Sequence, residues 1–116
     1  MGIVYADDSY QPGEEPIFEL RYTPGRVIAT SDTLTGTPTV KVYRMADRVD
    51  VTSNVAGPPA ISGVLKGTPS RVANSVFIQL QNLIDGAEYD VQCKCDTTNG
   101  ESDIEIDLIV TCRALP

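Results

Sequence analysis

Three cysteines share one stretch of the chain, YDVQCKCDTTNGESDIEIDLIVTC, which runs from residue 89 to residue 112. Cys93 and Cys95 stand two residues apart, so on an extended strand both thiols would face one side and could bind a metal ion. A closed zinc site needs four ligands, usually Cys or His, and the chain has no histidine. Only Cys112 could join the pair. We therefore expect no metal and no cofactor.

A cysteine can also act as a nucleophile or form a disulfide. Nucleophilic catalysis needs an activating base or a helix N-terminus beside the thiol, and the sequence offers neither, so we expect a protein that is not an enzyme. Neighbouring cysteines on one strand face do not meet disulfide geometry, so Cys93 and Cys95 are interpreted as small apolar core residues. Cys112 is left unpaired and is a candidate for a disulfide to another chain.

Acidic residues are the other candidates for chemistry. Asp103, Glu105 and Asp107 alternate along one predicted strand face. Calcium is bound by oxygen ligands, but these usually converge from a loop, whereas alternation along a strand spreads carboxylates out. We expect a solvated outer face, with calcium binding as the open alternative.

A β-hairpin is needed to position these residues. Residues 89–95 alternate between apolar and polar side chains, as expected for a half-buried strand. Asn99-Gly100 is typical of a type I′ hairpin turn, because both positions tolerate positive φ. This turn would pair Cys95 with Ile104. It would also place Cys112 opposite about residue 87, far from the other two cysteines.

The rest of the chain consists of short alternating runs separated by turn residues, and no window shows the 3.6-residue period of a helix. Residues 1–16 are expected to form an extended N-terminal arm, and residues 17–116 one all-β domain. Three prolines and three glycines within residues 56–71 predict a long loop. About seven strands favour a β-sandwich over a small barrel. Besides the hairpin, strands are expected near residues 3–5, 16–23, 26–30, 39–45, 49–52 and 74–82.

Length and charge narrow the possible functions. The 116 residues suit one domain, and nine basic against sixteen acidic residues give a net charge of −7. An acidic surface repels phosphate backbones, so nucleic-acid binding is not expected. No apolar run is long enough to span a bilayer, and the first residues lack the features of a signal peptide, so we expect a protein that folds in the cytoplasm and binds no membrane.

One block, SVFIQLQNLIDGAEYDVQCKCDTTNGESDIEIDLIV, resembles the small immunoglobulin-like virion proteins of tailed bacteriophages. In that family a leucine, a G-x-x-Y-x-V motif, a Thr-Thr pair and a glycine precede the closing strand. The resemblance extends from about Ile17 to Val110 and implies an immunoglobulin-like or fibronectin III-like β-sandwich, in which the motif's tyrosine makes a corner contact near the start of the penultimate strand. The matching positions are Leu80, Gly86, Tyr89, Val91, Thr97, Thr98 and Gly100.

The resemblance implies a non-enzymatic virion structural protein that binds the capsid surface or the head–tail neck as a decoration or connector component. Its partners would be major capsid, portal, neck or fibre proteins and further copies of itself, in a virion assembled in the host cytoplasm. The alternative is a carbohydrate- or protein-binding β-sandwich module of a larger cell-surface or fibre assembly.

Interface residues are predicted where apolar side chains fall in segments with no obvious local core, because such side chains need a partner to cover them. In the arm these are Val4, Tyr5 and Tyr10, and in the long loop Val64 and Leu65. The alternative for each of them is packing against its own domain.

Overall fold

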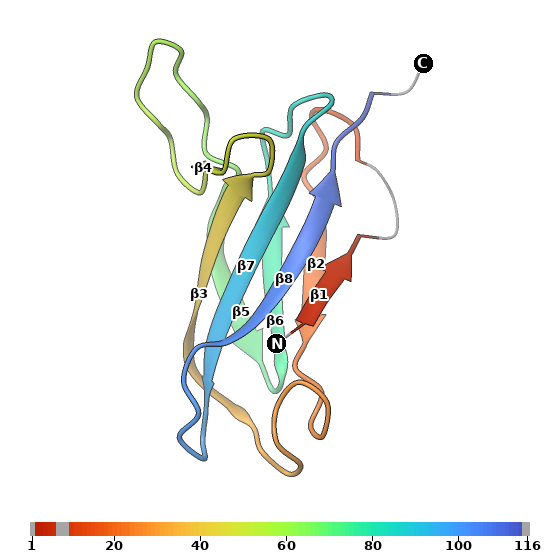
Figure 1. Ribbon diagram of the computed structural model, residues 1–116, viewed down its shortest axis with the longest axis vertical. Coiled ribbons are helices and arrows are strands. Elements are labelled where there is room, and N and C mark those ends of the chain that lie inside the picture. The colour runs from red at the N-terminus through yellow and green to blue at the C-terminus, as the bar shows by residue number, and fades with distance from the viewer. Residues whose placement is uncertain (1, 7–9, 115–116) are drawn as a thin grey trace.

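The computed structural model describes residues 2–6 and 10–114. Over these residues the chain is all-β, and its eight strands form two sheets arranged as the two layers of a sandwich (Figure 1). The described residues form no helix, and hence none that is long and apolar enough to cross a membrane. The all-β prediction is confirmed, with one strand more than the seven expected.

One sheet has five strands and the other has three. In the larger sheet β1 runs parallel to β8, whereas every other neighbouring pair is antiparallel. The smaller sheet is antiparallel throughout. In sheet order the strands are β1 (Gly2–Tyr5), β8 (Ile104–Thr111), β7 (Glu88–Thr97), β3 (Leu34–Arg44) and β4 (Val49–Asp50), and then β2 (Ile17–Arg21), β6 (Ser75–Leu80) and β5 (Leu65–Val72).

The hydrophobic core lies between the two sheets and follows from alternation along the strands. β7 and β8 contribute most of one wall, and β2 and β6 contribute the other. Burial of these apolar side chains supplies the main driving force for folding. The inward-facing residues that the sequence predicted for the hairpin are buried, which confirms its alternation: Tyr89, Val91, Cys93, Cys95, Ile106, Leu108, Val110 and Cys112, with Ile104 partly buried.

Two buried tyrosines are fixed by hydrogen bonds. Tyr22 follows β2 and is fully buried, and its hydroxyl donates to the Cys93 carbonyl at 2.9 Å, which links the two sheets. Burial raises the pKa of the Tyr22 phenol, so the group stays a hydrogen-bond donor. The Tyr89 hydroxyl accepts a hydrogen bond from the Ile84 backbone N–H at 3.1 Å. This is the corner contact that the G-x-x-Y-x-V motif implies.

The hairpin register is confirmed, but its turn is not. Cys95 pairs with Ile104, and the Cys112 N–H donates to the Ala87 carbonyl. The positive φ angles fall on Gly100 (95°) and Asp103 (54°) and not on Asn99, so the two-residue type I′ turn is wrong. Asp32, which lies outside the hairpin, holds the turn by accepting hydrogen bonds from the Thr98 hydroxyl and the Asn99 N–H.

The predicted strand at residues 26–30 is wrong. Thr23 accepts hydrogen bonds from the N–H groups of Arg26 and Val27, so the chain turns here instead of extending. Ile28 still enters the core, with 4% of its surface exposed. An apolar run of five residues can bury one side chain from a turn as well as from a strand, and periodicity alone does not separate the two cases.

The predicted loop at residues 56–71 is wrong in its second half, which forms β5. The pairing of β5 with β6 shifts between Lys66 and Ser70, where Gly67 has a φ of 68°. β5 is the last strand of its sheet, and glycine and proline are tolerated at such an edge when the ladder is irregular. β3 likewise begins five residues before the predicted residue 39, through an irregularity around Gly36.

Candidate functional site

The three cysteines are free thiols buried in the core. Burial raises the pKa of Cys93 to about 11 and raises the pKa values of Cys95 and Cys112, so all three remain protonated at neutral pH. The backbone of Cys112 bonds to Ala87, which directly precedes β7 and lies six residues before Cys93 in the chain. A disulfide from Cys112 to another chain would first require this end of the sandwich to open, because its side chain is fully covered.

The acidic outer face of the larger sheet is less solvated than the alternation suggested. Asp90 is buried, and its Oδ2 accepts a hydrogen bond from Arg48 at 3.0 Å. Asp107 is partly buried, and Oδ1 of each of these aspartates lacks a hydrogen-bond partner among the described residues. Across residues 2–6 and 10–114 no three carboxylate or thiol groups converge in a way that could hold a metal ion.

Asp107 makes folding sensitive to pH. Burial, followed by the nearby carboxyl groups of Glu105 and Asp90, raises the pKa of Asp107 from 3.8 to about 7. Because the folded pKa lies above the unfolded one, the folded state binds more protons between these values, and stability falls as pH rises from about 4 to about 7. Asp107→Asn is expected to remove this slope and to raise the free energy of unfolding above neutral pH by about 1 kcal/mol.

Urea unfolding at about pH 5 and about pH 8 measures this effect, because linkage predicts a different change in stability for the two proteins. The unchanged protein should be weaker at the higher pH, and the Asp107→Asn variant should change much less. Glu101→Gln, at an exposed acid in the hairpin turn, is the control and should keep the slope. An unchanged slope in Asp107→Asn would show that Asp107 titrates normally.

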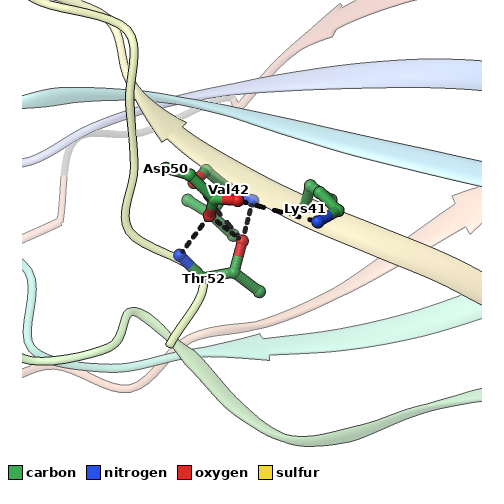
Figure 2. Close-up of polar contacts among 4 residues, drawn as sticks. All are labelled: Lys41, Val42, Asp50 and Thr52. Atoms are coloured by element: carbon green, nitrogen blue, oxygen red, sulfur yellow. Dashed lines mark hydrogen bonds and ion pairs between the residues drawn. The ribbon is translucent and has the colours of Figure 1, made fainter. Parts of the chain in front are cut away.

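A polar cluster holds the base of the 53–63 loop, which projects beyond the end of the sandwich (Figure 1). β4 ends at Asp50, and the Thr52 hydroxyl then accepts the Val42 N–H at 2.8 Å (Figure 2). Asp50 accepts hydrogen bonds from the hydroxyl and the N–H of Thr52, and Lys41 lies 3.7 Å from the Asp50 carboxylate. These bonds, the Thr52 hydroxyl first, lower the pKa of Asp50. The cluster thus replaces backbone pairing where β4 stops.

Three of the predicted interface residues, two in the loop and one in the arm, pack against their own domain. Val64 is 2% exposed and belongs to the core, and Leu65 is partly buried at the start of β5. Tyr10 is half-buried, and its ring packs edge-on against Phe18 with 5.4 Å between ring centroids. The alternative stated for these positions, packing against their own domain, therefore describes all three.

The remaining predicted contacts, Val4 and Tyr5, lie on an exposed apolar edge. Ile3, Val4 and Tyr5 on β1 are 64%, 45% and 70% exposed, and Ile17 on β2 is 67% exposed. A groove of about 260 Å³ lies between β1 and β2, and its lining residues are Val4, Tyr5, Ala6, Tyr10, Phe18, Glu19, Leu20 and Leu108. We call the exposed side chains of Ile3, Val4 and Tyr5 on β1 the apolar edge.

Sequence reasoning missed Asp32, which organises the far end of the sandwich. Asp32 is 1% exposed, and its Oδ1 accepts hydrogen bonds from the Thr33 N–H, the Thr98 hydroxyl and the Asn99 N–H. Burial raises the pKa of Asp32, but hydrogen bonding, first to the Thr97 side chain and then to the three groups just named, outweighs it and lowers the pKa overall. The only signal in the sequence is an Asp next to Ser and Thr, which is common in turns.

No family model and no curated protein matches the chain.

Proposed function

We propose that this protein is a non-enzymatic structural module of a tailed-phage virion, with an immunoglobulin-like fold. The strand order supports the fold: β8, β7 and β3 form the centre of one sheet and face β2, β6 and β5, as in immunoglobulin-like sandwiches that carry extra strands on the larger sheet. The corner contact of Tyr89 supports it as well. A fold of this kind is compatible with many functions, so the surface has to carry the functional argument.

The apolar edge is the observation on which the functional proposal rests. Three consecutive exposed apolar side chains on β1, an outer strand of its sheet, form the kind of feature that marks a protein–protein contact. The buried thiols with raised pKa values are poor nucleophiles, so they favour a binding module over an enzyme. The module would dock on capsid, portal, neck or fibre proteins in the host cytoplasm and leave with the virion.

Co-sedimentation with assembled particles tests this function. The chain is expected to band with intact virions in a density gradient of the producing lysate, and Tyr5→Asp should reduce the amount bound several-fold, because a charge would be desolvated at the contact. Val72→Asp, at an exposed apolar residue of β5, should bind like the unchanged protein. A chain that stays in the soluble fraction would contradict the virion proposal. Binding to glycans instead would favour the alternative of a carbohydrate-binding module.

A further inference from the structure

β1 is an unprotected sheet edge. It is the last strand of the larger sheet and pairs with β8 on one side. The Ala6 N–H donates to the Ile109 carbonyl, so alternation directs the backbone of Val4 and Ala6 toward β8. The N–H and C=O groups of Ile3 and Tyr5 then point away from the sheet. Such groups form a template for pairing with another strand.

The other three outer strands carry the features that natural proteins use to block such pairing, which are charge, proline, irregularity and short length. β5 has Lys66, Pro69 and Arg71 and an irregular register. β2 carries Glu19 and Arg21, and β4 is only two residues long. β1 differs from all three, because residues 2–6 are Gly, Ile, Val, Tyr and Ala, with no charge and no proline.

We propose that β1 pairs antiparallel with β1 of a second copy of this chain, about a twofold axis, so that the two five-stranded sheets become continuous. An uncharged apolar strand is complementary to itself, as an isologous contact requires. Charge favours the second copy over a basic partner. A site for a basic partner would use some of the sixteen acidic residues, whereas two copies that each carry −7 can approach most easily where the surface is neutral.

The proposed β1–β1 contact is expected to be weak because it is small. A strand of four residues buries much less than the roughly 1,200 Å² of a stable interface, so association should depend on concentration. Copies held close together, for example on a repeating surface, would associate much more readily. The pairing concerns the isolated chain, so it can hold or fail independently of the proposed role in a virion.

Sedimentation velocity of the full chain over a wide concentration range tests the proposal. The unchanged protein should shift from monomer to dimer, and Ile3→Lys should weaken the association constant by at least about tenfold, because a charge would be desolvated against the strand of the second copy. Val72→Lys is the matched control, since Val72 on β5 is 62% exposed against 64% for Ile3, and it should dimerise normally. Thermal melting verifies that each variant is folded.

A mixture of Ile3→Lys and Tyr5→Glu provides the decisive measurement. Pairing through the outward backbone groups of Ile3 and Tyr5 sets position 3 of one copy opposite position 5 of the other, so opposite charges there should restore dimers that neither variant forms alone. The proposal is overturned if the unchanged protein remains monomeric at its highest soluble concentration, if Val72→Lys weakens dimers equally, or if the mixture stays monomeric. None of these results decides the proposed role in a virion, which the co-sedimentation experiment tests separately.

Discussion

Tyr22→Ala is expected to lower the free energy of unfolding by about 3–5 kcal/mol, the range for deleting a buried aromatic ring. Tyr22 is fully buried between the sheets, and its hydroxyl also satisfies the Cys93 carbonyl. The loss is a large part of the roughly 5–15 kcal/mol that stabilises a typical domain, so the variant should be near its threshold for folding. Urea unfolding monitored by circular dichroism measures the change.

Two further substitutions separate packing from hydrogen bonding. Tyr22→Phe keeps the ring and should cost about 1 kcal/mol, the net value of one hydrogen bond. Tyr5→Ala removes a ring of the same size from an exposed position and should change stability by less than about 0.5 kcal/mol. Equal losses in Tyr22→Ala and Tyr5→Ala would contradict the role of Tyr22 as a link between the sheets.

Gly63→Ala is expected to cost about 1–3 kcal/mol, because it overpacks the base of the 53–63 loop. An added Cβ would lie 2.9 Å from backbone atoms of Ser53 and Asn54, and backbone cannot move aside as a flexible side chain can. The Gly63 N–H donates to Asn54 Oδ1, and the Gly63 carbonyl accepts from Asn82. The strain should therefore open the loop base locally.

Hydrogen exchange can locate this strain. The amides of Val55 and Ile61 bond to each other's carbonyls across the loop, and both should exchange faster in Gly63→Ala. Ser62→Ala, at the exposed neighbouring residue, is the control and should leave stability and exchange unchanged. Unchanged protection at both amides in Gly63→Ala would show that the loop base accommodates a side chain.

Features set by local alternation could be predicted from the sequence. The apolar face of the hairpin and the register that pairs Cys95 with Ile104 depend on residues close together in the chain. The same alternation assigned Cys93 and Cys95 to the core, and both are buried. Val4 and Tyr5 were singled out because an apolar arm lacks a local core, and both are exposed.

Features set by contacts between distant residues could not be predicted from the sequence. The turn at Asn99 is held by Asp32, 67 residues earlier, so a dipeptide preference was overridden by a tertiary hydrogen bond. Residues 26–30 have the composition of a strand, but hydrogen bonds to Thr23 hold them in a turn. Glycine and proline made β5 look like a loop, although it pairs with β6 as an edge strand.

By itself, the sequence determined which side chains of the hairpin must be buried, because burial there follows from the two-residue period of each strand. The tertiary structure alone decided which strands lie at the edges of the sheets and which acidic side chains are shielded from solvent. β1 lies parallel to β8 at the open side of the larger sheet, and Asp90 and Asp107 come together from neighbouring strands. Strand order depends on how whole sheets pack, so it cannot be predicted from residues that are neighbours in the sequence. The apolar edge and the titration of Asp107 both arise from that order.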